Sequence, residues 1–239
     1  MFARRTSSPA RVAQALLLRR VEYGESDLVV TLLTDSIGRV SALARGARKS
    51  AKRFGGVIEP MHTLRIAYDD RSGAELVVLR EAKLERARSY LVTNLDGMQA
   101  AGQALNWVRK AAPPRTPEPE VWAIMERLLD HLDYRDDASS AQARLAAAGL
   151  QLLSAFGWGI DFERCVSCGK APAEGQAAAV DATRGGLVCR DCGGARRRLS
   201  GKERVALSRA ASGGELDDDA APLALDLVEQ ALRTHGGIE

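Results

Sequence analysis

Short apolar runs alternate with polar turns from residue 13 to about residue 84. Runs of this length, rich in aliphatic and β-branched side chains, are typical of strands. Turn signals of the Gly, Asp and Ser type separate them at 23–24, 35–38 and 69–73. We therefore predict five strands, at about 13–20, 27–34, 39–45, 57–68 and 74–79. Five short strands in one compact segment favour a small barrel of the OB type.

The hydrophobic period becomes helical after Lys83, where leucines and alanines recur every three or four residues as far as Val108. A proline-rich segment at 113–119 ends this first helix. Thr116 is placed to cap the second helix, with Pro117 as its first residue. The fourth barrel connection, residues 46–56, is also expected to form a short helix before its paired glycines.

Further helices follow on both sides of a cysteine-containing segment. A third helix is predicted to begin near Ser139 or Ser140 and to end at Gly157. Ser200 and Glu203 form a capping-box pattern that opens a fourth helix. A last helix is expected at about 222–235. The predicted fold class is α+β: an OB-fold barrel at 1–82 and a helical domain at 83–239, with a module inserted at about 162–195.

The cysteines follow a CxxC, twenty residues, CxxC pattern. Each CxxC turn can direct two thiolates at one ion, and glycines after both turns permit the backbone to fold back on the sulfur atoms. Two disulfides or a thioredoxin-like redox pair are the alternatives. This spacing favours one structural zinc ion without an open position for catalysis. The predicted ligands are Cys165, Cys168, Cys189 and Cys192.

Positive charge gathers near the N-terminus. Residues 1–56 contain eleven Lys and Arg against four acidic residues, a net charge of +7, which leaves −4 for the rest of a chain with net charge +3. Such a field attracts polyanions, although charge runs are more often solvated faces. The candidate nucleic-acid contacts are Arg19, Arg20, Arg39, Arg45, Arg48, Lys49, Lys52 and Arg53. Tyr23, Phe54 and Tyr68 are either stacking surfaces for bases or core residues.

Enzyme signatures are absent from the sequence. Residues 46–50 resemble a phosphate loop but lack its second glycine, and no GxGxxG, GxSxG or HExxH pattern occurs. We therefore expect no catalytic residues. No apolar run approaches the roughly 20 residues of a membrane span, and the run at 15–18 is too short for an export signal. We expect a cytoplasmic, nucleoid-associated protein without a membrane partner.

Two groups of residues resemble a known family. The first comprises 23–27 (YGESD), 32–34 (LLT), Gly38 and 45–49 (RGARK). In order and spacing it is similar to the N-terminal signature of RecO, the bacterial recombination mediator family. The second, 152–158 (LLSAFGW) leading into 165–169 (CVSCG), resembles the helix that enters the zinc module of that family.

The resemblance implies a DNA-binding protein of DNA repair and recombination. Family members bind single- and double-stranded DNA, anneal complementary strands without ATP, and work with RecR to help load RecA onto DNA coated by single-strand-binding protein. They contact the acidic C-terminal tail of that protein. The signature assigns phosphate contacts to Arg39, Arg45, Arg48 and Lys49, whereas Arg53 rests on charge alone. Some members lack the cysteines, which implies a structural metal.

Two other classes of function remain open at this point. An RNA-binding factor or a nucleic-acid enzyme can use the same barrel and cysteine module. A protein-interaction adaptor can use the module while its basic face is incidental. Activity with magnesium separates the first class from a mediator, and failure to bind any oligonucleotide favours the second.

Overall fold

The computed structural model describes residues 10–70, 74–134 and 139–237. The chain divides into two compact units. The first comprises residues 1–87 together with the segment Pro113–Glu118, and the second contains residues 88–112 and 119–239. None of the helices in the described ranges is both long and apolar enough to cross a membrane.

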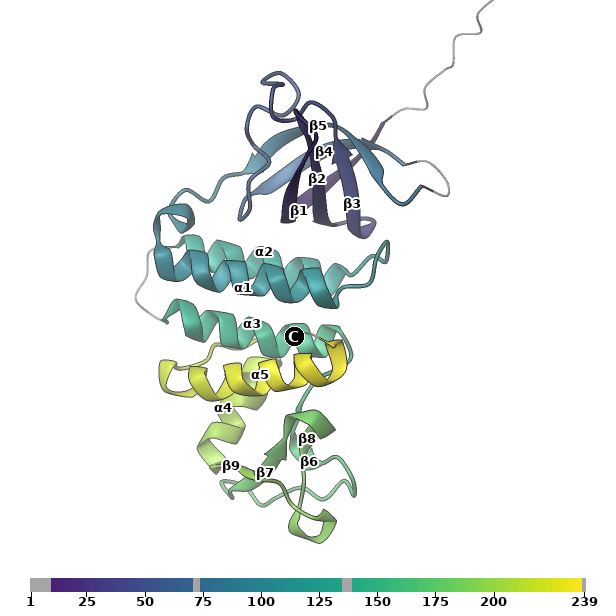
Figure 1. The fold of residues 1–239 in the computed structure, drawn as a ribbon. Coiled ribbons are helices and arrows are strands. Elements are labelled where there is room, and N and C mark those ends of the chain that lie inside the picture. The colour runs from purple at the N-terminus through teal and green to yellow at the C-terminus, as the bar shows by residue number, and fades with distance from the viewer. Residues whose placement is uncertain (1–9, 71–73, 135–138, 238–239) are drawn as a thin grey trace, which may run out of the picture. The chain divides into compact units, whose positions relative to one another are not determined.

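The first unit is a closed five-stranded barrel, as predicted (Figure 1). The strands follow the order β1-β2-β3-β5-β4, and β4 closes against β1. Neighbours pair antiparallel except β3 and β5, which run parallel. The strands are β1 (Arg11–Tyr23), β2 (Asp27–Thr34), β3 (Gly38–Ala44), β4 (Thr63–Asp69) and β5 (Val77–Arg86).

Strict alternation of side chains fills the barrel. In β3, buried residues alternate with half-exposed ones along the whole strand, since successive side chains point to opposite faces of a sheet. The small residues Ala42 and Ala44 share this core with the larger Leu32 of β2 and Ile66 of β4. Phe54, from the connection between β3 and β4, joins this core at 1% exposure.

Three predicted strands had wrong limits. β1 (Arg11–Tyr23) extends beyond both ends of the predicted 13–20. β4 begins at Thr63, not near residue 57, because Gly56 and Met61 adopt left-handed backbone angles that no regular strand accepts. β5 begins at Val77 and continues to Arg86, beyond the predicted end at residue 79. The predicted turn at 69–73 lies partly outside the described residues.

The connection at 46–56 consists of turns, so the short helix predicted there is wrong. Gly46, Gly55 and Gly56 all have positive φ angles. A right-handed helix cannot include residues with such angles, and these glycines lie near the two ends of the segment. The connection therefore folds as a compact loop over one end of the barrel.

The second unit is helical. Its centre is α3, which packs against α1, α2, α4 and α5 (Figure 1). Close approach requires a small residue at Gly149, where a Cβ atom would lie 3.0 Å from both the Trp107 ring and a Val228 methyl group. The α-helices of the described residues are α1 (Leu95–Ala111), α2 (Pro119–Asp133), α3 (Ala141–Ala155), α4 (Gly201–Ala211) and α5 (Ala221–Gly236).

Helix ends confirm two predictions and overturn one. Ser140 caps α3 by accepting a hydrogen bond from the Ala143 amide, and the capping box of Ser200 and Glu203 opens α4. α2, however, begins at Pro119, so Thr116 does not cap it. The Thr116 hydroxyl instead donates to the Pro114 carbonyl.

A strap between α1 and α2 belongs to the barrel unit. The Arg115 amide donates to the Arg39 carbonyl at 2.8 Å, and the Arg115 guanidinium pairs with Asp70 at 3.0 Å. The strap passes so close to Gly38 that a Cβ atom there would lie 1.8 Å from the Thr116 carbonyl oxygen. Only glycine fits at this position.

The cysteine module lies between α3 and α4 in the chain. It forms a small sheet in the order β6-β8-β7-β9, in which β7 and β8 make the hairpin expected between the two CxxC turns (Figure 1). Its strands are β6 (Asp161–Cys165), β7 (Ala178–Asp181), β8 (Gly186–Leu187) and β9 (Arg197–Leu199).

Candidate nucleic-acid interface and metal centre

The β1–β2 hairpin extends past the barrel core and carries charged residues on its inward face. Arg20 pairs with Val30 and Glu22 with Leu28, and both partners belong to the barrel core. Cross-strand partners point to the same side of a sheet. Arg20 and Glu22 therefore continue the inner face beyond the point where apolar side chains fill it.

The β3–β4 connection is anchored beside this hairpin by its backbone. The Gly46 amide donates to the Asp27 carboxylate at 2.7 Å, and the Arg48 amide donates to the Ser26 carbonyl at 3.0 Å. Farther along, the Ala82 amide of β5 donates to the Arg53 carbonyl at 3.0 Å. These bonds fix the path of the connection and thereby the backbone positions of its cationic residues.

The hairpin and the connection enclose a groove of about 580 Å³ at the end of the barrel. Three cations line it: Arg20, Arg48 and Lys49. Its apolar wall includes Phe54 and Ile58. Two carboxylates also line it, Glu22 and Glu59. A cationic groove with a partly apolar wall suits a polyanion that also exposes flat apolar groups, as a nucleic-acid strand does.

The predicted DNA contacts separate into groups. Arg45 and Lys52 are exposed on the same connection as Arg48 and Lys49. Arg53 is held by that connection, because its guanidinium donates to the Arg45 carbonyl at 2.8 Å and lies over the Phe54 ring.

Two predicted contacts lie elsewhere on the barrel. Arg19 is exposed on the face of β1 opposite Arg20, because adjacent strand residues point to opposite sides. Arg39 lies near the start of β3 and Arg45 just beyond its end, roughly 20 Å apart at the usual rise of a strand. The groove therefore gathers only part of the predicted set.

The aromatic candidates also divide. Phe54 and Tyr68 are core residues at 1% and 2% exposure. Tyr23 is 61% exposed at the end of β1, close in sequence to the groove residue Glu22. Tyr23 is thus the aromatic candidate that remains available to stack on a base.

Sequence reasoning missed the two carboxylates of the groove. Glu22 pairs with Arg48 at 3.0 Å, and Glu59 pairs with Arg20. Glu22 follows Arg20 by two residues in a predicted strand, so strand periodicity was a usable signal for a shared face. Glu59 carried no such signal, because its position depends on the irregular path of the β3–β4 connection.

The four cysteine sulfurs converge, as predicted from their spacing. All four Sγ atoms lie within 4.8 Å of one another, and Cys168 and Cys189 approach to 3.6 Å. Sulfurs around a tetrahedral zinc ion, with bonds of about 2.3 Å, would be about 3.8 Å apart. None of the four is in a disulfide. The cluster can hold a metal ion, and its donor set fits zinc.

Backbone geometry prepares the cysteine cluster for anionic sulfur. The Cys189 amide donates to the Cys165 sulfur at 3.4 Å, and this bond is the main cause that lowers the pKa of the Cys165 thiol to about 6. The pKa of the Cys192 thiol, by contrast, is raised to about 12, mainly by the hydrogen bond between the Cys192 and Cys189 side chains. A bound metal cation would stabilise the thiolate form of the four cysteines. Gly169 and Gly193, which follow the two CxxC turns, have the predicted positive φ angles.

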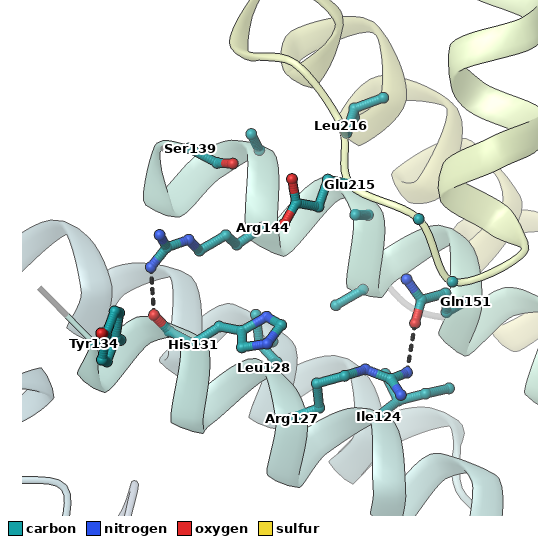
Figure 2. A pocket seen from close by; sticks show the side chains of 15 residues that line it. Ile124, Arg127, Leu128, His131, Tyr134, Ser139, Arg144, Gln151, Glu215 and Leu216 are labelled. Atoms are coloured by element: carbon teal, nitrogen blue, oxygen red, sulfur yellow. Dashed lines mark hydrogen bonds between the residues drawn. The ribbon is translucent and has the colours of Figure 1, made fainter. Parts of the chain in front are cut away.

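A second cavity, which sequence reasoning missed, lies in the helical unit between α2, α3 and the segment 213–216 (Figure 2). Its volume is about 310 Å³. Arg127, His131 and Arg144 line it, and Figure 2 shows the Arg127 guanidinium bonded to Gln151 and that of Arg144 to the His131 carbonyl. Arg127 and His131 are four residues apart on α2, which was the available signal for a shared face.

Two family models match nearly the whole chain. The N-terminal model of Recombination protein O matches residues 11–88 and the C-terminal model matches residues 93–238. The chain belongs to the RecO family. This places the barrel, the helical unit and the cysteine module within a family of DNA repair proteins.

Similar proteins share most of their length with this RecO family member. DNA repair protein RecO of Anaeromyxobacter sp. (strain K) is 37% identical over 212 residues, which cover 87% of this chain and 82% of the relative. RecO of Myxococcus xanthus is 36% identical over 179 residues, 75% and 71% of the two chains. RecO of Geobacter sulfurreducens is 33% identical over 181 residues, 75% and 72%.

Proposed function

We propose that this chain is a DNA-binding recombination mediator that anneals complementary strands without ATP and without catalytic residues of its own. The observation that carries the proposal is the groove at the end of the barrel, where Arg20, Arg48 and Lys49 converge beside an apolar wall. Cations that neutralise phosphates reduce repulsion between two strands and leave their base edges free to pair. No chemical step is needed.

The DNA contacts proposed for this function are Arg19, Arg20, Arg39, Arg45, Arg48, Lys49, Lys52 and Arg53. Arg45, Arg48 and Lys49 form the central group, since they are close in sequence on one anchored connection. Three contacts of this kind contribute a salt slope of about 2.7 on duplex DNA and about 2.1 on single strands. Both single- and double-stranded DNA are proposed ligands.

The proposal is tested by annealing complementary oligonucleotides coated with single-strand-binding protein, without nucleotide. A variant with Arg45, Arg48 and Lys49 changed to Glu is expected to lose annealing and to bind DNA with a flatter salt dependence. A control with Arg65, Lys83 and Lys202 changed to Glu carries the same net charge, but these exposed residues lie outside the groove. Equal activity of the two variants would contradict the assignment.

Three further assays distinguish the other functions. Cleavage of DNA or RNA in the presence of magnesium would indicate a nuclease. Preference for RNA over DNA of the same sequence would indicate an RNA-binding factor. Failure of the intact chain to bind any oligonucleotide at moderate salt would favour a protein-interaction adaptor.

The proposed protein partners are RecR, the acidic C-terminal tail of single-strand-binding protein and, indirectly, RecA. For the acidic tail we favour the cavity of Figure 2, because Arg127, His131 and Arg144 line it together with apolar residues such as Leu128. Arg127→Glu should weaken binding of a fluorescent peptide with the tail sequence. The peptide should bind the groove variant Lys49→Glu as it binds the wild type, and equal loss in both variants would contradict this location.

We further propose that Cys165, Cys168, Cys189 and Cys192 hold one structural zinc ion. The support is the convergence of the four sulfurs, together with a set of protein ligands that leaves no position open for a water molecule. Bound zinc would supply cross-linking of the two CxxC turns and no reaction chemistry.

A further inference from the structure

Two of the three groove cations already have carboxylate partners. Arg48 Nη1 lies 3.0 Å from Glu22 Oε2, and Arg20 pairs with Glu59 while also donating to the Ile58 carbonyl at 3.1 Å. Within the described residues, no carboxylate forms an ion pair with Lys49. The groove therefore combines one available cation with two that are internally neutralised.

These ion pairs are accessible to solvent and therefore exchangeable. The side chains of Arg48 and Glu22 are 41% and 69% exposed, and those of Arg20 and Glu59 are 49% and 46% exposed. Exposed pairs contribute little free energy, typically no more than about 1 kcal/mol. A strand of phosphates, which presents the same anionic oxygens to a guanidinium, can displace such carboxylates.

Exchange requires no rearrangement of the backbone. The Arg48 amide is bonded to the Ser26 carbonyl, and Arg20 lies in the β1–β2 ladder opposite Val30. Each guanidinium can thus leave its carboxylate by side-chain rotation while its Cα atom stays in place. The backbone of the two glutamates also remains in place. Glu22 lies in β1, and the Glu59 amide donates a hydrogen bond to the Val57 carbonyl.

We infer that Glu22 and Glu59 are built-in competitors of phosphate, which lower the affinity of the groove and allow bound strands to leave it readily. This inference rests on the proposed function, because it assumes that nucleic acid is the ligand of the groove. The displaced carboxylates remain within reach of the guanidinium groups, so the ion pairs can form again as a phosphate departs. A protein that pairs two strands must release the product, and weakened phosphate contacts serve that step.

Affinity for a single-stranded oligonucleotide tests the inference. Glu22→Gln and Glu59→Gln are each expected to tighten binding roughly two- to fivefold, the range that corresponds to an exposed ion pair, and together by about tenfold. The matched control is Glu25→Gln, an equal change of charge in the nearby β1–β2 turn. Glu25 is exposed and forms no ion pair within the described part of the chain. The signal is the gain in affinity beyond that of the control.

A double-mutant cycle separates competition from a general charge effect. In an Arg48→Gln background, Glu22→Gln should give no more gain than Glu25→Gln, because the cation for which Glu22 competes is absent. A full gain in that background would overturn the inference.

The remaining outcomes distinguish the inference from the proposed function. If the wild-type chain binds the oligonucleotide and neither glutamine variant exceeds the control, only the competitor role fails. If neither the wild-type chain nor the double glutamine variant binds it, both fail. Slower release of a labelled strand by the double variant, in proportion to its gain in affinity, would support the proposed effect on release.

Discussion

The substitution Phe54→Leu tests whether the core of the barrel fixes the basic connection. Phe54 is 1% exposed within the barrel core, and the Arg53 guanidinium lies 5.2 Å from the centre of its ring. Replacing a buried Phe by the smaller Leu costs about 1 kcal/mol, and loss of an exposed cation–π contact adds about 0.5–1 kcal/mol. We therefore expect the connection to lose about 1.5–2 kcal/mol of stability.

Hydrogen exchange at one backbone amide reports this loss. The Ala82 amide donates to the Arg53 carbonyl at 3.0 Å, so it exchanges when the connection detaches from β5. A loss of this size should accelerate its exchange about tenfold to thirtyfold. The Val188 amide, bonded to the Ala179 carbonyl in the cysteine module, is the internal control and should exchange at the wild-type rate.

The same variant links packing to binding. With the connection loosened, Arg48 and Lys49 must be ordered when a strand binds, so affinity for DNA should fall although no cation has been removed. Unchanged exchange at Ala82 would refute the reasoning, because it would mean that the connection does not depend on Phe54 for its position. Accelerated exchange with unchanged affinity would leave the packing argument intact and refute its link to binding.

Three further predictions concern the second unit. Metal analysis should find one zinc ion per chain, lost in Cys165→Ser and Cys189→Ser, and disulfides detected by mass spectrometry would contradict this. Gly149→Val should destabilise the helical unit by about 1–3 kcal/mol, because its Cβ atom would lie 3.0 Å from both the Trp107 ring and a Val228 methyl group. The melting temperature should fall by about 2–4 °C per kcal/mol. Ser200→Ala should lower stability by about 1 kcal/mol in denaturant unfolding. Hydrogen bonds from Ser200 lower the pKa of Glu203, so this stabilisation is complete above about pH 5 and is lost as the pH falls through the lowered pKa. The variant should therefore show a weaker dependence of stability on acid pH.

Local patterns predicted the elements of the fold well where one periodicity dominated. Strands β2 and β3 could be predicted from their alternation, and helices α3 and α4 from their capping residues. Each of these signals depends on residues that are near in sequence. The limits of β4 and β5 could not be predicted in this way. Val57 and Ile58 have strand propensity, but they follow glycines with positive φ and lie in irregular backbone.

The candidate sites differ in the same way. The convergence of the four cysteines was predictable because they lie in two short motifs with a fixed spacing. The groove was predictable only in part, since charge alone does not distinguish Arg48, which lines it, from Arg39 at the far end of β3. The cavity of Figure 2 joins three segments of the helical unit, and no local pattern marks such a meeting.

The strap Pro113–Glu118 limits how the molecule can be divided into fragments for experiments. Because it lies between α1 and α2 yet belongs to the barrel unit, the polypeptide passes from one unit to the other three times. A fragment ending at residue 87 would keep all five strands but lose the partners that Arg115 supplies to Arg39 and Asp70. Binding studies on the isolated N-terminal fragment would thus report on a barrel with an uncovered edge at Gly38, and the intact chain is the proper reference.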